Sequence, residues 1–190
     1  NADALARLGI VLAQHALMRP AAVDAVRLLL LTGARPGEIC RLRWSEVEKD
    51  RIVLKQAKRG PRSIPLGRAA IAVLDARRKQ RTGSPFVFPH HTDPNAPMPL
   101  PTKTTWSVFK REAKLAPDVR LHDLRHNLAS HALLAGESLL VAGALLGHSR
   151  PTMTARYAHI ADDSLATAAQ HISAEIASME VGRSRAEARS

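Results

Sequence analysis

Residues 31–39 read Leu-Thr-Gly-Ala-Arg-Pro-Gly-Glu-Ile and contain two signals that turn the chain. Apolar residues at helical spacing predict a helix over 21–31, and Gly33 ends it because glycine takes the left-handed backbone that closes many helices. Pro36 suits the first turn of a new helix, where its missing N–H costs nothing. The turn between them therefore presents the guanidinium of Arg35 at a helix end, although an isolated arginine there is ordinarily a surface charge.

The rest of the chain is mostly helical in pattern. Apolar spacing and helix-boundary residues predict further helices over 4–18, 38–42, 67–81, 103–115, 121–134, 138–146, 151–157 and 162–179. Residues 51–55 and 62–66 are rich in β-formers, with turn residues between them, which predicts a hairpin. Pro65 confines the second strand to a sheet edge or a strand end. A short buried strand is expected over 86–88 and a loop over 90–101.

The expected fold class is therefore mainly α with a small antiparallel β-sheet (α+β). Its 190 residues, 45% of them hydrophobic, can bury a core as one domain. Cys40 is the single cysteine, so no intramolecular disulfide can form, which suits a reducing cytoplasm. No apolar run is long enough to span a membrane.

The charge balance indicates a polyanionic partner. Lysine and arginine number 28 against 17 acidic residues, for a formal charge of +11. Clustered cations release counterions from nucleic acid and steer its approach. Aromatic residues make up only 3%, which leaves little surface for stacking on unpaired bases and favours duplex DNA.

Two further segments carry side chains that suit a phosphate. His122 and Arg125 are three residues apart on a predicted helix and so share one face. An isolated pair of this kind is more often a solvated polar face, and His126 forms no metal-binding pattern with His122. Tyr157 is the only tyrosine of the chain, and it follows His148, which lies at a predicted turn.

Together these segments resemble the tyrosine recombinase (phage integrase) family. The resemblance lies in residues 31–39, in His-Asp-Leu-Arg-His at 122–126, and in Leu-Gly-His-Ser at 146–149 leading to Arg-Tyr-Ala-His at 156–159. The three boxes occur in the family's order, with a lysine-bearing hairpin between the first two. Each box alone is a weak match, whereas the ordered set is highly specific.

The resemblance implies a catalytic role for each matching residue. Tyr157 would attack the scissile phosphate, whose non-bridging oxygens Arg35 and Arg125 would clamp. His122 would assist proton transfer at the nucleophile, and His148 would hydrogen-bond the phosphoryl group. No metal, ATP or other cofactor is implied.

The family's hairpin lysine would protonate the departing 5′ oxygen. Lys58 matches it, and Lys55 is the alternative because the hairpin loop is slightly short. Where the family commonly has Thr-Phe, Asn127 and Leu128 stand here, a change expected to affect packing only. The residues expected to contact DNA are Arg35, Lys58, Arg59, Arg62, Arg125, Arg150 and Arg156.

The resemblance also implies an organisation and partners. Residues 1–180 would form the catalytic domain, in which the helix within 160–180 docks either in cis or on a neighbouring protomer. Residues 181–190 would be a flexible charged tail, and the family's N-terminal DNA-clamping domain is absent from this sequence. The expected partner is double-stranded DNA, bound by a homo-tetramer of a chain that is monomeric in solution. The expected location is cytoplasmic, at the bacterial nucleoid, with no membrane contact.

Two other functions fit parts of the pattern. A type IB topoisomerase uses similar phosphotyrosine chemistry to relax supercoils, whereas the boxes favour recombination. A catalytically silent DNA-binding module would explain the charge, but it would not explain a full set of candidate catalytic residues.

Overall fold

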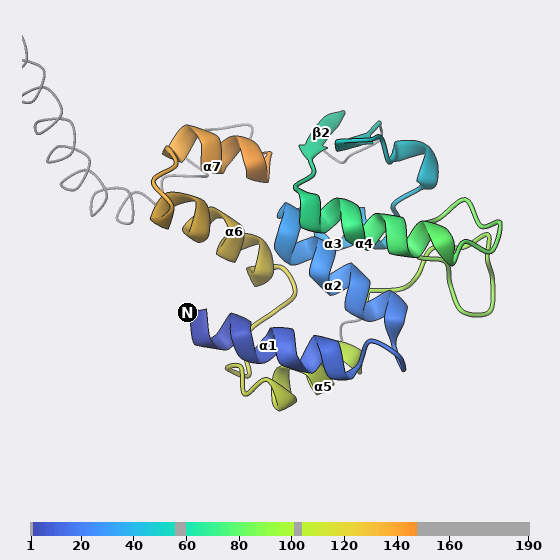
Figure 1. Ribbon diagram of the computed structural model, residues 1–190, viewed down its shortest axis with the longest axis horizontal. Coiled ribbons are helices and arrows are strands. Elements are labelled where there is room, and N and C mark those ends of the chain that lie inside the picture. Colours follow the sequence, from blue (N-terminus) through green and yellow to red (C-terminus); the bar gives the residue numbers. More distant parts are fainter. Residues whose placement is uncertain (1, 56–59, 101–103, 148–190) are drawn as a thin grey trace, which may run out of the picture. The chain divides into compact units, whose positions relative to one another are not determined.

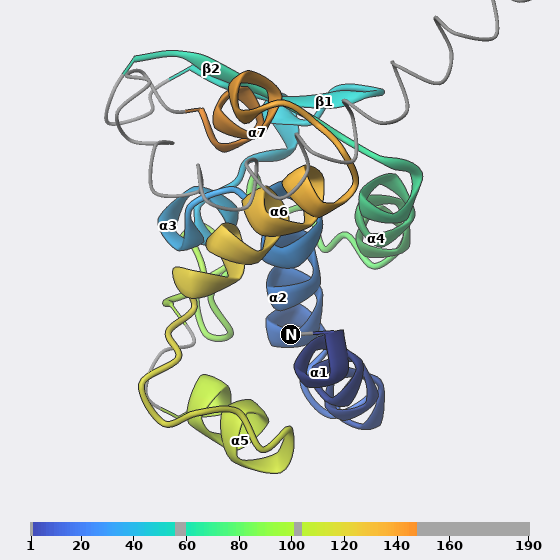
Figure 2. The same ribbon diagram turned by 90° about the vertical axis from the view of Figure 1, so that its left-hand side faces the viewer.

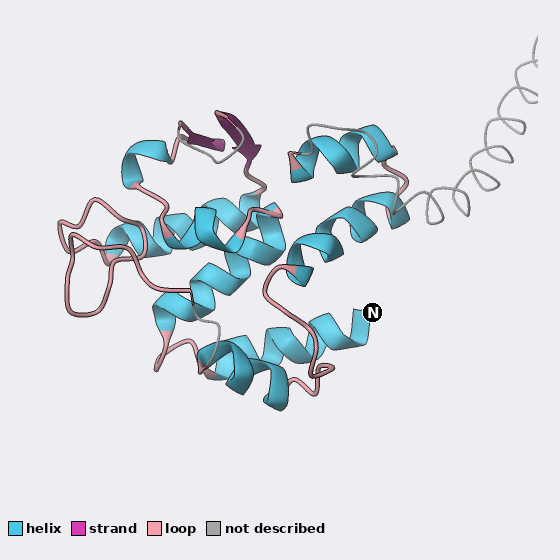
Figure 3. Ribbon diagram, turned by 180° about the vertical axis from the view of Figure 1, so that it is seen from behind, coloured by secondary structure: helices cyan, strands magenta, loops and turns pink. Residues whose placement is uncertain are grey.

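The computed structural model describes residues 2–55, 60–100 and 104–147. They fall into two compact units, the first holding residues up to 129 together with 145–147, and the second holding 130–144. Within the described residues, the secondary structure is mainly helical, with one two-stranded antiparallel sheet, as predicted (Figures 1 and 3). The elements are α1 (Ala2–Gln14), α2 (Pro20–Thr32), α3 (Pro36–Cys40), the 3-10 helix η1 (Trp44–Glu46), β1 (Arg51–Leu54), β2 (Arg62–Pro65), α4 (Arg68–Lys79), α5 (Thr105–Glu112), α6 (Asp123–Leu134) and α7 (Leu139–Leu146).

Helix α2 is the buried centre of the first unit. It packs against α3 and α4 (Figures 1 and 2), and residues such as Val23, Val26 and Leu28 have no exposed surface. Both boundaries follow the local chemistry of the sequence. Pro20 is the first helical residue, and Gly33 ends the helix in the left-handed conformation, donating its N–H to the carbonyl of Leu29.

Helices α1 and α5 pack against each other in the same unit. Apolar residues of α1, such as Leu8 and Leu12, and the aromatic rings of Trp106 and Phe109 in α5 are buried. The Nε2 of His15 lies 2.7 Å from a carboxylate oxygen of Glu112 and ties the end of α1 to the end of α5. Both helices are shorter than the sequence pattern predicted.

The hairpin of β1 and β2 is antiparallel, as predicted. Ile52 faces Ile64 across the ladder, and both side chains are buried, whereas flanking residues of each strand are more exposed. This alternation follows from the two-residue period of a strand with one face on the core. Pro65 is the last residue of β2, which agrees with the limit that a missing N–H sets on a ladder.

The strand predicted over 86–88 is wrong. Phe86, Val87 and Phe88 are buried, but Phe86 forms only an isolated bridge with Arg43. The N–H of Val87 donates to the carbonyl of Leu42, and the carbonyl of Phe88 accepts a bond from a later loop. The apolar run is therefore buried without forming a strand. Its side chains lie in the core, and its backbone N–H and carbonyl groups are hydrogen-bonded to loop residues.

In the second unit, α7 begins where the sequence indicates. The hydroxyl of Ser138 accepts a hydrogen bond of 3.2 Å from the N–H of Val141, which caps the helix. Gly136 takes a φ of +89° between α6 and α7. The predicted helices over 151–157 and 162–179 and the tail over 181–190 lie outside the described residues. Among the described residues, no helix has the length and apolarity needed to cross a membrane.

Candidate phosphate-binding site

The turn after α2 is built around Gly33. Its φ of +59° lies in the left-handed region, and a Cβ there would lie 2.7 Å from Leu128 Cδ2 and 3.1 Å from Leu146 Cδ2. The hydroxyl of Thr32 donates to the carbonyl of Leu28 at 2.5 Å and accepts the N–H of Ala34 at 3.2 Å. The backbone that leads to Arg35 therefore has a fixed path. The Leu128 side chain lies close to this turn.

Arg35 is held in place by Glu38. The Glu38 carboxylate accepts the backbone N–H of Arg35 at 2.8 Å and its guanidinium Nη1 at 2.7 Å. Arg35 is the residue before α3, so Glu38 occupies the third position of that helix and caps its first turn. The sequence reasoning gave Glu38 no role. The spacing of a carboxylate three residues after a helix-initiating position was the signal that could have found it.

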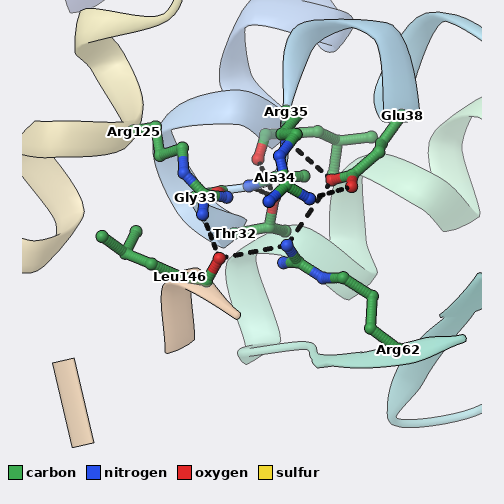
Figure 4. Close-up of polar contacts among 9 residues, drawn as sticks. Thr32, Gly33, Ala34, Arg35, Glu38, Arg62, Arg125 and Leu146 are labelled. Carbon is green, nitrogen blue, oxygen red and sulfur yellow. Dashed lines mark hydrogen bonds and ion pairs between the residues drawn. The ribbon is translucent and has the colours of Figure 1, made fainter. Parts of the chain in front are cut away.

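Arg125 enters the same turn from α6. Only 3% of its surface is exposed. Its Nη1 donates to the carbonyl of Gly33 at 2.6 Å, and its Nη2 donates to the carbonyl of Leu146 (Figure 4). A buried charge is tolerated only with such partners. The two carbonyls therefore orient the guanidinium beside the turn that carries Arg35.

Arg62 reaches the same place from β2. Its Nη1 donates to the carbonyl of Leu146 at 3.0 Å and lies 3.8 Å from Glu38 Oε2. Its pKa is lowered, first by burial and then by the charge of Arg35, while Glu38 acts in the opposite direction. We call Arg35, Glu38, Arg62 and Arg125 the arginine cluster. Three guanidinium groups against one carboxylate leave it two positive charges, which suits an anionic ligand.

His122 lies just before α6 and near this cluster. Partial desolvation lowers the pKa of its imidazole, and the positive charges of Arg125 and Arg35 lower it further. Its ring stands edge-on to that of His126, with centroids 5.3 Å apart. The lowered pKa favours the neutral imidazole, and a neutral imidazole can accept a proton.

The structure thus brings Arg35, Arg62, His122 and Arg125 to one region. Lys55, the alternative general acid, is exposed just after β1. Among the described residues, no three His, Cys, Asp or Glu side chains gather as a metal site. The remaining predicted site residues lie outside the described residues, and their roles stay predictions: Lys58, Arg59, His148, Arg150, Arg156 and Tyr157.

Comparison with known proteins agrees with the boxes and the fold. Residues 10–164 match the model of the phage integrase family, and the chain belongs to that family. It is 32% identical over 144 residues to the integrase of Escherichia phage P2, covering 73% of this chain and 37% of that protein. It is also 32% identical over 144 residues to the tyrosine recombinase XerA of Pyrococcus horikoshii, covering 72% and 50%. The chain spans half or less of the length of these two relatives.

Solved recombinase structures share the fold. The crystal structure of XerA recombinase matches with a TM-score of 0.64 at 24% identity, covering 86% of this chain and 61% of that one. The XerH site-specific recombinase, solved bound to its difH substrate, matches with a TM-score of 0.68 at 16% identity, covering 83% and 49%. At these identities the likeness establishes the fold of the chain.

Proposed function

We propose that the chain is the catalytic part of a site-specific DNA recombinase that cuts and rejoins duplex DNA through a 3′-phosphotyrosine at Tyr157. The observation that carries the proposal is the placement of Arg35 and Arg125 at one turn. Glu38 holds the first, and backbone carbonyls hold the second. Membership of the phage integrase family supports the same function.

The two arginines would clamp the non-bridging oxygens of the scissile phosphate. A planar guanidinium matches two phosphate oxygens, and its orientation here is set before the ligand arrives. Attack on phosphorus increases the negative charge on those oxygens. A preorganised donor aimed at such a charge contributes about 3 kcal/mol to lowering the barrier. Arg35 and Arg125 would thus supply electrostatic stabilisation from side chains, without metal or ATP.

Proton transfers complete the reaction. The phenol oxygen of Tyr157 forms a bond to phosphorus as its proton passes to the neutral imidazole of His122. The bond from phosphorus to the 5′ oxygen breaks, and a hairpin lysine protonates that oxygen. Lys58 is the proposed acid and Lys55 the alternative, while His148 hydrogen-bonds the phosphoryl group. The phosphotyrosine keeps the energy of the broken link, so a 5′ hydroxyl from another strand can reverse the step.

The proposal extends to assembly and location. Exchange of strands between two duplexes requires four cleavages, which a homo-tetramer on DNA provides. Residues 1–180 would form the catalytic domain, with the helix of 160–180 docked in cis or on a neighbour. Arg59, Arg150 and Arg156 would add phosphate contacts around the cut. The chain would act at the bacterial nucleoid.

The test is covalent capture of DNA by the chain. Nicked duplexes with a randomised sequence around the nick are incubated with the chain, and adducts that survive denaturation are sequenced. We expect the chain to select a cleavable sequence and the modified peptide to contain Tyr157. Tyr157→Phe should form no adduct while its affinity for the duplex stays nearly unchanged, because only the attacking oxygen is lost.

Other outcomes would contradict the proposal in distinct ways. An adduct formed by Tyr157→Phe would show that another residue is the nucleophile. Absence of any adduct with the unaltered chain, combined with tight duplex binding, would indicate a silent DNA-binding module. Relaxation of a supercoiled plasmid that lacks the selected sequence would indicate a type IB topoisomerase.

A further inference from the structure

The backbone carbonyl of Leu146 accepts hydrogen bonds from two guanidinium groups. Arg62 Nη1 donates from β2 at 3.0 Å, and Arg125 Nη2 donates from α6 (Figure 4). A carbonyl oxygen has two lone pairs, so these donors fill its capacity. One oxygen atom at the end of α7 thereby joins the hairpin to the helix that carries Arg125 of the proposed phosphate clamp.

Gly147 allows this approach of Arg62 to the backbone. Its φ is +61°, and a Cβ there would lie 2.8 Å from Arg62 Nη1 and 2.9 Å from Arg62 Cζ. The guanidinium therefore lies directly against the main chain of Gly147. The next residue in the sequence is His148, the proposed phosphoryl ligand.

Folding stability alone does not account for a guanidinium at position 62. Its side chain is only 12% exposed, and its Nε and Nη2 have no hydrogen-bond partner among the described residues. Buried donors without partners cost free energy. The substitution Arg62→Met would avoid that cost, since Leu146 would keep the bond from Arg125 and Glu38 would keep Arg35.

We infer that Arg62 is a positioning residue that fixes the lysine-bearing hairpin relative to the phosphate clamp. Arg62 follows the proposed general acid Lys58 by four residues, on the strand that leaves the hairpin turn. Fixing its guanidinium to the Leu146 carbonyl sets where that strand starts relative to Arg125. In the proposed reaction, the position of this strand is what sets the general acid relative to a phosphate held by the clamp. This inference rests on the proposed function.

The experiment compares two leaving groups. Adduct formation is timed on the selected duplex with its normal 5′ oxygen and with a 5′-bridging sulfur, which leaves as a thiolate and needs little protonation. A positioned general acid contributes roughly 10²–10⁴-fold, so a displaced one should slow Arg62→Met by about tenfold or more on the oxygen substrate. On the sulfur substrate we expect Arg62→Met to react within about threefold of the unaltered chain, because the missing step is bypassed.

Two further variants make the comparison specific. Arg62→Lys keeps the charge and loses the planar fork, so it should show the same sulfur rescue if geometry matters. It also keeps the test available if Arg62→Met folds poorly. Arg51→Met is the matched control, since Arg51 lies on β1 of the same hairpin and is exposed, with Asp50 as its partner. We expect it to react on both substrates like the unaltered chain.

The outcomes separate this inference from the function on which it rests. Equal slowing of the Arg62 variants on both substrates, or no slowing on either, would overturn the positioning role alone. Failure of the unaltered chain to form any adduct would overturn the proposed function, and the inference with it. Thermal unfolding of each variant, measured alongside, identifies any loss of reactivity that comes from loss of fold.

Discussion

His122 has its protonation set by its surroundings. Desolvation and the charges of Arg125 and Arg35 lower its pKa, while Asp123 acts in the opposite direction. The unfolded chain therefore binds a proton at this residue at higher pH than the folded chain does. This contribution to stability is intact above the ordinary imidazole pKa of about 6.5. It is lost as the pH falls from there through the folded value, where the folded imidazole is protonated in turn.

This charge environment predicts a measurable titration. In NMR spectra of the folded chain, the imidazole of His122 should titrate below about pH 6.5, and in concentrated urea it should return to that ordinary value. The signal is assigned by its absence in His122→Gln. A midpoint in the folded chain equal to or above the urea value would show that desolvation and the nearby arginines together do not lower the pKa of this ring.

The junction of α2 and α3 is the element on which the site depends most. Gly33 has the positive φ that ends α2, and its carbonyl accepts Arg125. An added methyl group would lie 2.7 Å from Leu128 Cδ2, which must then shift, and in tight contact with Leu146 Cδ2 at 3.1 Å. Backbone conformation and packing therefore both require glycine at this position.

Replacement of this glycine should be costly. Gly33→Ala combines left-handed strain of about 1–2 kcal/mol with overpacking of about 1–3 kcal/mol, so chemical denaturation should show a loss of roughly 2–5 kcal/mol. Gly83→Ala is the matched control, because Gly83 has a φ of +83° and no atom within 4 Å of an added Cβ. It should show only the conformational cost. Equal losses in the two variants would show that the contacts with Leu128 and Leu146 are not tight.

The elements that could be predicted from the sequence are those whose ends are set by a proline or a glycine. Pro20 and Gly33 delimit α2, and Pro65 ends β2, because each acts through its own backbone. The strand predicted over 86–88 is wrong because apolar composition predicts burial but does not supply a partner strand. Its backbone partners lie in loops.

The site was predictable only in part, for a related reason. Arg35, His122 and Arg125 stand in recognisable boxes, and the structure brings them together. The role of Glu38 follows from a local helix cap at the start of α3. The internal contacts of Arg62 could not be foreseen, because its acceptor belongs to Leu146, 84 residues further along the chain.

At the scale of the whole molecule, the formal charge of +11 would govern the proposed encounter with DNA. Binding of a fluorescent random-sequence duplex should weaken by roughly 10³-fold between about 50 and 200 mM salt, if some six phosphates are neutralised. Tyr157→Phe is used for the measurement so that no covalent capture distorts it. A flat response to salt would remove counterion release as the source of affinity.

The Leu146 carbonyl, which accepts two guanidinium groups at the end of α7, also bears on how position 146 tolerates substitution. The oxygen that receives both guanidinium groups belongs to the main chain, so any amino acid at position 146 still provides it. Substitutions at position 146 change the packing of an apolar side chain but keep the carbonyl that binds Arg62 and Arg125. Saturation mutagenesis of position 146 will therefore identify it as a replaceable core residue. The role of its carbonyl is revealed only by substitution of the two donors, Arg62 and Arg125.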